Sequence, residues 1–232
     1  MRILAVESSG MVAAAAIMEK GRLLGEFLLD HKKTHSQQLM PLIAQLLNSL
    51  DMTLSEIDVF AVSQGPGSFT GLRIGIATVK GLAQAAGKQV VGIPTLDGLA
   101  YNLSCREGLI CPIMDARRDQ VYTAVYRSDG SDIERLEDYM AIPVKELAEK
   151  LKGYDEHVIF NGDGIPVYWD VIKAELGDKA RPAPANLLMQ HASSVARLAL
   201  VEAQQGKTQS YNELIPFYLR KSQAEQKFAH MG

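Results

Sequence analysis

A carboxylate and two hydroxyls, Glu7, Ser8 and Ser9, end the first apolar run of the chain, which covers residues 2–9. A short run rich in Ile, Leu and Val predicts a buried strand. A carboxylate at the end of that strand could hold a hydrated magnesium ion, or it could simply cap the turn. The residues leave both roles open, and the magnesium role would make Glu7, Ser8 and Ser9 candidates for a nucleotide-proximal site.

A glycine-rich loop lies between two apolar patterns in the region 58–83. The run at 58–63 is short enough for a buried strand, and Ser68 can cap a helix through its hydroxyl. Apolar residues then recur at helical spacing and form one stripe: Leu72, Ile76, Val79 and Ala83. The pattern therefore predicts a strand, a glycine-rich loop and a helix.

Two explanations compete for the glycines of this segment. A glycine loop before a helix can present backbone N–H groups to a phosphate. However, Gly65-x-Gly67 continues to Gly71, one residue off the dinucleotide pattern, and no Gly-Lys-Ser/Thr sequence follows. Gly71 and Gly75 share one helix face, and each costs about 1 kcal/mol of helix propensity relative to alanine. Gly81 adds to this cost. A helix that carries all three glycines is expected to pack closely against another backbone, inside the domain or in another chain.

His35 offers the start of a metal-site pattern, but the position four residues further on is Leu39. One imidazole is too few for a site, so we predict no metal ligand and give His35 a capping or interface role. No Ser-His-Asp set can be built from the spacing alone, so we name no catalytic residue. A protease stays a third hypothesis, which metal analysis and a casein digest would decide. Cys105 and Cys111 match no zinc or redox spacing, and the apolar run around Cys111 predicts a buried thiol.

The composition indicates a globular protein of one large domain or two small ones. The chain has 232 residues, 47% of them hydrophobic, which is enough for a sizeable core. Its net charge of −3, from 24 basic and 27 acidic residues, gives no general electrostatic reason to bind nucleic acid. The low cysteine content fits a reducing cytoplasm, and no run reaches the roughly 18 apolar residues of a membrane span. We therefore expect a cytoplasmic protein with no membrane partner.

A helix is predicted over residues 39–50, with Pro41 acceptable only near its first turn. Its apolar face is wide: Leu39, Met40, Leu42, Ile43, Leu46, Leu47 and Leu50. One flank of this stripe can cover a sheet, and the other would remain apolar in water. Because contiguous exposed apolar surface usually marks a binding site, we expect this helix to meet another subunit.

The two halves of the chain share one order of elements. Each reads as three antiparallel strands, a helix, a strand and a helix, although the residues themselves are not alike. We therefore predict two α/β lobes, one at 1–103 and one at 104–232, with a cleft between them near the carboxyl ends of the strands. In the second half, a long amphipathic helix is predicted over 186–205, and the last segment can pack back on the first lobe.

Several separate segments resemble the TsaB (YeaZ) family. The run Gly65-Pro66-Gly67-Ser68-Phe69-Thr70-Gly71-Leu72-Arg73-Ile74-Gly75 resembles its glycine-rich signature. Residues 35–43, 115–122 and 216–220 also look like that family. The match extends over most of the chain, although beyond Tyr122 it depends more on element order than on motifs.

The resemblance implies two actin-like (RNase H-like) lobes, each a mixed sheet with flanking helices, as in sugar kinases. It also implies a role in forming threonylcarbamoyladenosine (t6A) beside the anticodon of tRNA. In that system the related subunit TsaD carries the metal and the transfer chemistry, and TsaE is an ATPase that joins the pair. ATP and a metal ion are therefore expected on the partners and not on this chain. Glu7 stands where nucleotide-binding relatives carry Asp, and Gly162-Asp163-Gly164 is only weakly similar to their adenosine-binding loop.

We therefore expect a non-catalytic subunit that binds and activates TsaD through the helices of the first lobe and meets tRNA through the complex. The expected contact residues are His35, Leu39, Leu42, Ile43, Leu46, Gly71, Leu72, Arg73, Gly75, Ile76 and Val79. Without TsaD the same surface should form a homodimer, since an isologous pair hides an apolar patch. The alternative is a stand-alone ATP-binding small-molecule kinase or ATPase of the same fold, which tight Mg²⁺-dependent ATP binding would indicate.

Asp115 ends a predicted strand and is followed by Arg117, Arg118 and Asp119. These charges can pair with one another in a solvated hairpin turn, where surface ion pairs contribute little to stability. In the family context the same turn could instead contact the partner protein or tRNA. The residues alone leave both interpretations open.

Overall fold

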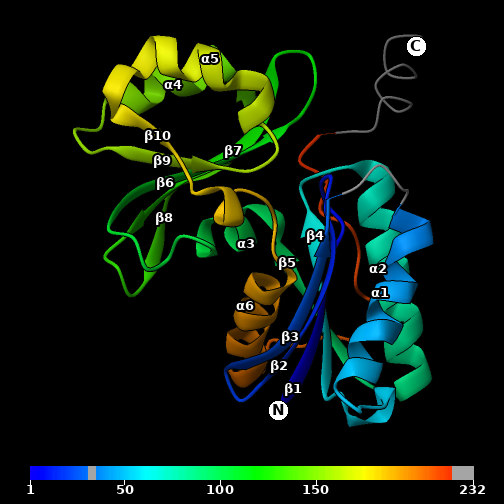
Figure 1. Ribbon diagram of the computed structural model, residues 1–232. Helices are drawn as coiled ribbons and strands as arrows, with labels where there is room; N and C mark the ends of the chain where they lie inside the picture. Colours follow the sequence, from blue (N-terminus) through cyan, green and yellow to red (C-terminus); the bar gives the residue numbers. More distant parts are fainter. Residues whose placement is uncertain (31–34, 221–232) are drawn as a thin grey trace, which may run out of the picture.

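The computed structural model describes residues 1–30 and 35–220, and it shows two lobes that each contain a five-stranded mixed sheet (Figure 1). The first sheet consists of β1 (Arg2–Glu7), β2 (Ala13–Glu19), β3 (Arg22–Leu29), β4 (Val59–Gly65) and β5 (Gln89–Pro94). Strand β1 pairs antiparallel with β2 and parallel with β4. The carboxyl ends of β1 and β4 therefore lie side by side, which brings Glu7 close to Ser63.

The second sheet repeats the arrangement of the first. It consists of β6 (Gly108–Asp115), β7 (Gln120–Ser128), β8 (Ile133–Pro143), β9 (Val158–Asn161) and β10 (Ala180–Pro182). The strand orders are β3-β2-β1-β4-β5 and β8-β7-β6-β9-β10. Both sheets thus place the third, second, first, fourth and fifth strands of their lobe in that order. The two-lobe fold predicted from the order of elements is confirmed.

Helices cover both faces of the first sheet. Helices α1 (His35–Ser49) and α2 (Phe69–Ala86) lie on one face, and α6 (Ala192–Gln204) lies on the other (Figure 1). Val195, Ala199 and Leu200 of α6 pack with residues of β1, β4 and β5 in one buried cluster. The first lobe is therefore built from two separate stretches of chain, and α6 belongs to it although it follows the second sheet in sequence.

The remaining helices accompany the second sheet: α3 (Thr95–Tyr101), α4 (Val144–Lys152) and α5 (Ile165–Leu176). Helices α4 and α5 pack on one face of that sheet, in the cluster that contains Cys111. The Cys111 thiol is fully buried, as predicted, and its burial raises the pKa to about 12. Cys105, in contrast, is exposed.

Helix α1 begins at His35, four residues before the predicted start, so Pro41 lies inside the helix. Proline at such a position removes one intrahelical hydrogen bond and costs about 3 kcal/mol. The same helix buries Leu39, Leu42, Ile43 and Leu46, and each buried side chain of this kind contributes about 1.5–3 kcal/mol. Burial against the sheet therefore outweighs the effect of the proline.

The helix predicted from residue 186 is wrong at its start, since α6 begins at Ala192. His191, with φ −122° and ψ 130°, has extended backbone. The first turn is capped from another element: Glu26 of β3 accepts hydrogen bonds from Ser193 N at 3.0 Å and Ser193 Oγ at 2.9 Å. Because Glu26 and Ser193 are far apart in sequence, no local sequence motif predicts this cap.

The end of the described chain, residues 205–220, forms a strap over the first lobe. Gln209 pairs with Val90 of β5, and the Leu214 side chain is buried in the core. Further along, Phe217 N donates to Gln64 O at 2.7 Å. Arg220 Nη1 then donates to Ala116 O of the second lobe at 3.1 Å. The strap therefore connects the two lobes.

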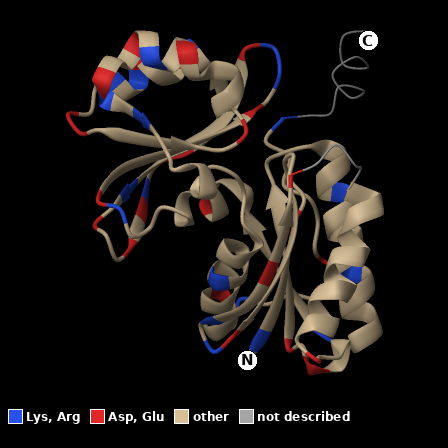
Figure 2. Ribbon diagram, in the orientation of Figure 1, with Lys and Arg blue, Asp and Glu red and all other residues tan. Residues whose placement is uncertain are grey.

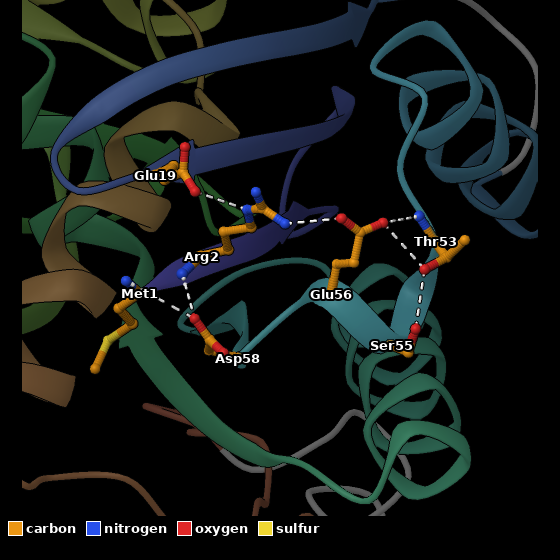
Figure 3. Close-up of polar contacts among 7 residues, drawn as sticks. All are labelled: Met1, Arg2, Glu19, Thr53, Ser55, Glu56 and Asp58. Atoms are coloured by element: carbon orange, nitrogen blue, oxygen red, sulfur yellow. Dashed lines mark hydrogen bonds and ion pairs between the residues drawn. The ribbon is translucent and has the colours of Figure 1, made fainter.

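Figure 3 shows the polar contacts that hold the amino-terminal end of β1, the end opposite Glu7. The backbone N–H of Arg2 donates to Asp58 Oδ2 at 2.7 Å, and its Nε donates to Glu19 Oε1 at 2.8 Å. Its Nη1 donates to Glu56 Oε1 at 2.9 Å, and Glu56 Oε2 accepts from Thr53 N at 2.8 Å. These contacts join β1 to β2 and to the segment before β4, so we assign them a structural role.

Candidate functional site

The Glu7 carboxylate lies at the end of β1 and is almost completely buried. Its Oε1 accepts hydrogen bonds from Ser9 N at 2.6 Å and Ser9 Oγ at 2.5 Å, and its Oε2 accepts one from Ser63 Oγ. Burial raises the pKa of this carboxyl, and the hydrogen bonds from Ser63 and Ser9 counteract part of the rise. Both carboxylate oxygens are thus engaged by the chain itself, which favours the turn-capping role over the magnesium role.

The turn after β1 packs directly on the first turns of α2. A Cβ atom at Gly71 would lie 2.0 Å from Ser8 O, and one at Gly75 would lie 2.3 Å from Ser8 Oγ. The N–H of Ser68 donates to Ser9 O at 2.7 Å. The Ser68 hydroxyl caps the helix as predicted, accepting from Gly71 N at 3.3 Å. The close-packing explanation for Gly71 and Gly75 is therefore confirmed, and the packing lies inside the domain.

His35 fastens the start of α1 to the same turn. Its Nε2 donates to Gly10 O at 2.9 Å, and its Nδ1 is buried without a partner in the described part of the chain. Within residues 1–30 and 35–220, no three His, Cys, Asp or Glu side chains are grouped so that they could hold a metal ion. The geometry gives His35 a positioning role for α1.

The second lobe meets this turn through Asp163 and Gln190. A Cβ atom at Gly10 would lie 2.4 Å from Gln190 Nε2 and 3.0 Å from Asp163 Oδ2, so the two lobes touch at Gly10. Asp163 accepts a hydrogen bond from Asp115 N at 3.2 Å. Burial first, and then the charges of Asp115 and Glu7, raise the pKa of Asp163 to about 6. Three carboxyl groups with little exposure to solvent, those of Glu7, Asp115 and Asp163, are thus grouped at the boundary between the lobes.

Most of the predicted contact residues lie in the interior of the first lobe. Each of the following side chains is at most 6% exposed: Leu39, Leu42, Ile43, Leu46, Leu72, Ile76 and Val79. They contact the sheet and neighbouring helices, so their side chains present almost no surface to another subunit. Arg73 is exposed, and its Nε donates to Tyr218 Oη at 3.1 Å.

The outward face of α1 and α2 is nearly free of charge and contains an apolar groove. A shallow groove of about 490 Å³ is lined by Met40, Ala77, Thr78, Gly81 and Leu82, and Met40 is 48% exposed. A Cβ atom at Gly81 would meet no heavy atom within 4 Å, so close packing in the monomer does not explain this glycine. Met40 belonged to the apolar stripe predicted for this helix, but the periodicity did not indicate which flank covers the sheet, so these groove residues were not among the predicted contact residues.

Charge depletion sets these two helices apart from α4 and α5, the helices on the second sheet. Helix α1 has 15 residues and contains no Asp, Glu, Lys or Arg. Helix α2 has 18 residues, of which only Arg73 and Lys80 are charged. Figure 2 shows this contrast, since α4 and α5 carry blue and red segments while α1 and α2 are mostly tan. The absence of charge over residues 35–49 was visible in the sequence and is the signal that identifies this face.

Two lobes with the same strand order, meeting at the turn after β1, define an actin-like protein. Residues 24–228 match the family model described as "TsaD: tRNA N6-adenosine threonylcarbamoyltransferase". The chain is 32% identical over 228 residues to the tRNA threonylcarbamoyladenosine biosynthesis protein TsaB of Bacillus subtilis, covering 98% of each chain. It is 30% identical over 230 residues to TsaB of Escherichia coli, again covering 98% of each.

The solved structure of YeaZ from Pseudomonas aeruginosa is also similar, with a TM-score of 0.80 at 27% identity, covering 94% of this chain and 99% of that one. The chain belongs to the TsaB (YeaZ) family of tRNA threonylcarbamoyladenosine biosynthesis proteins. The resemblance seen in the glycine-rich run is thereby confirmed. Among the described residues, no helix combines the length and the apolar character needed to span a bilayer.

Proposed function

We propose that this chain is a non-catalytic subunit that binds TsaD and activates it for t6A formation on tRNA. In this proposal TsaE, an ATPase, joins the pair, and the partner subunits hold ATP and the metal ion. The observation that carries it is the charge-depleted face of α1 and α2, because depletion of charge distinguishes the buried core of protein interfaces. Membership of the TsaB family connects that surface to the t6A pathway.

The turn after β1 supports a role without chemistry of its own. Phosphoryl transfer needs a phosphate cradle, metal ligands and a positioning group together. In this chain the Ser68 N–H at the start of α2 donates a hydrogen bond to Ser9 O, and Ser9 and Ser63 donate hydrogen bonds to the Glu7 carboxylate. These contacts use the polar groups that a nucleotide or its magnesium ion would need, and they weigh against the stand-alone kinase or ATPase.

The proposal predicts that arginine at both Ala77 and Gly81 prevents binding to TsaD. Both positions are exposed in the groove, so the double variant should fold, but its interface would bury two unpaired charges. We expect affinity for TsaD, measured by titration calorimetry, to fall by about 100-fold or more, equivalent to roughly 2.7 kcal/mol. Charges at Leu46 or Ile76 would disrupt the core and could not test binding.

The matched control is Ala174→Arg, an exposed position on α5 of the second lobe, which should leave the affinity unchanged. Circular dichroism and thermal unfolding establish that each variant is folded. Binding of the folded double variant within twofold of the unmodified chain would show that this face is not the TsaD contact.

We also propose that, without TsaD, the groove face of α1 and α2 pairs with the same face of a second copy. An isologous dimer would cover the exposed Met40 and the neighbouring small residues. Sedimentation at about 50 µM, a concentration suited to ordinary transient affinities, should show a dimer. The Ala77→Arg/Gly81→Arg variant should sediment as a monomer. A monomeric unmodified chain at that concentration would refute the dimer.

A further inference from the structure

The turn between β6 and β7 has an unfavourable backbone at three consecutive residues. Arg117, Arg118 and Asp119 have φ values of 65°, 57° and 57°. This left-handed region is unfavourable for residues with a Cβ atom, and glycine would adopt it without that penalty. The turn is closed by hydrogen bonds from Gln120 N to Arg117 O at 3.2 Å and from Ala116 N to Gln120 O at 3.0 Å. Outliers of this kind are concentrated at ligand-binding sites.

The strained turn presents two guanidinium groups to solvent. The Arg117 side chain is 79% exposed, and its Nη1 lies 3.0 Å from Asp115 Oδ2. Arg118 is also exposed, and no ion pair involves it within residues 1–30 and 35–220. In Figure 2 the end of the β6–β7 hairpin is blue and lies on the side of the second lobe that faces the strap.

The strap brings a third arginine, Arg220, to the turn. Arg220 Nη1 donates to Ala116 O at 3.1 Å, which places its guanidinium against the turn. Two residues earlier, Tyr218 stacks on Phe69 with ring centroids 4.1 Å apart, and its hydroxyl accepts from Arg73 Nε. The stacking and this hydrogen bond hold the strap on α2 two residues before Arg220, which contacts the turn of the second lobe.

The solvent-facing side of the turn is positive although the whole chain has a net charge of −3. Asp115 and Asp119 are the acidic residues of the turn, and Asp115 also accepts a hydrogen bond from Tyr168 Oη at 2.9 Å. Asp163 lies buried behind Asp115. Toward solvent, Arg117 and Arg118 therefore lie beside one exposed carboxylate, that of Asp119, because the Asp115 side chain is only 13% exposed. A guanidinium matches a phosphate through two parallel N–H donors, and a turn of fixed backbone loses little entropy on binding.

We propose that Arg117, Arg118 and Arg220 form a contact surface for the phosphate backbone of tRNA. The inference rests on the proposed function, which brings a tRNA to the complex that contains this subunit. Guanidinium groups gathered at one turn suit a phosphodiester strand, in which every phosphate carries a negative charge. The surface lies at the lobe boundary and not on the groove face of α1 and α2, so TsaD and RNA could be bound at the same time.

The test uses the double variant Arg117→Gly/Arg118→Gly in the complex with TsaD and TsaE. Glycine removes both guanidinium groups and relieves the left-handed backbone, so thermal stability should stay the same or rise. The probe is an unmodified tRNA transcript, and fluorescence anisotropy measures its affinity between 50 and 300 mM salt, a range where phosphate contacts dominate. We expect about tenfold weaker binding or more, and a salt slope smaller by about 1–2.

Two further variants separate specific contacts from general charge. Arg117→Lys/Arg118→Lys keeps the charge and should retain part of the affinity, since a lysine contacts phosphate as a point charge. Lys145→Ala/Lys150→Ala removes two exposed positive charges from α4 and should leave tRNA binding within twofold of the unmodified complex.

Unchanged tRNA affinity of the glycine variant in an intact complex would overturn the inference. Loss of TsaD binding by that variant would also overturn it, because the turn would then contact protein and not RNA. If the unmodified chain forms no complex with TsaD, the proposed function fails. In that case the same anisotropy measurement is made on the isolated chain. Binding of the transcript that the glycine variant loses supports the proposed surface, and absence of transcript binding overturns it.

Discussion

The substitution Gly71→Ala should destabilise this protein by about 3 kcal/mol or more, a large effect for adding one methyl group. The new Cβ atom would lie 2.0 Å from Ser8 O and 3.3 Å from His35 Cδ2. The neighbouring backbone cannot move away cheaply, because Ser9 O accepts from Ser68 N and Ser8 Oγ donates to Gly71 O at 2.9 Å. Urea unfolding followed by circular dichroism measures the loss.

Gly81→Ala is the matched control, because it makes the same chemical change in the same helix. No heavy atom lies within 4 Å of its added Cβ atom, so only helix propensity changes. The control should therefore gain about 1 kcal/mol of stability. Equal effects of the two substitutions would refute the close packing of α2 against the turn after β1, and with it the reason we give for Gly71.

The second large effect is expected for Asp163→Asn, and it should depend on pH. The folded state raises the pKa of Asp163 from its ordinary value of 3.8 to about 6. An acid with a raised pKa holds its proton more tightly when folded, so the unmodified protein loses stability as pH rises from about 4 to about 6. Above that range the buried charge costs up to about 3 kcal/mol, at about 1.4 kcal/mol for each pKa unit.

Asparagine cannot ionise, and its side-chain oxygen can still accept from Asp115 N. We therefore expect Asp163→Asn to gain about 2–3 kcal/mol at pH 8 and to gain nothing at pH 4, where the aspartic acid is already neutral. Denaturant unfolding at both pH values measures the difference. Glu7 is also buried with a raised pKa, so some pH dependence should remain in the variant. The same stability change at pH 4 and pH 8 would contradict the assignment.

Local patterns in the sequence were sufficient for several features. The repeat of element order predicted two lobes, and the lobes prove to share one strand order. Ser68 was predicted to cap α2, and Cys111 to be buried, and both predictions are confirmed. These features depend on residues close together in sequence or on the hydrophobicity of one segment, which is why they can be read without coordinates.

Other features needed the tertiary structure, because they join residues far apart in the chain. Glu26 caps α6 from β3, and Leu214 completes the core of the first lobe after the second sheet has been built. An apolar stripe indicates that a helix is partly buried, but it does not indicate which flank of the stripe contacts the sheet. The atoms that pack against Gly71 could not be predicted from the sequence either, because they belong to residues far from Gly71 in the chain.

The sequence by itself thus determined the family, the repeated order of elements and the need for close approach at the glycine-bearing helix. Only the tertiary structure decided that Ser8 fills the space beside Gly71, and that Met40 and Gly81 lie on the outward face. The physical reason is that periodicity reports how much apolar surface a helix must bury, whereas the packing of distant segments selects the surface that stays exposed.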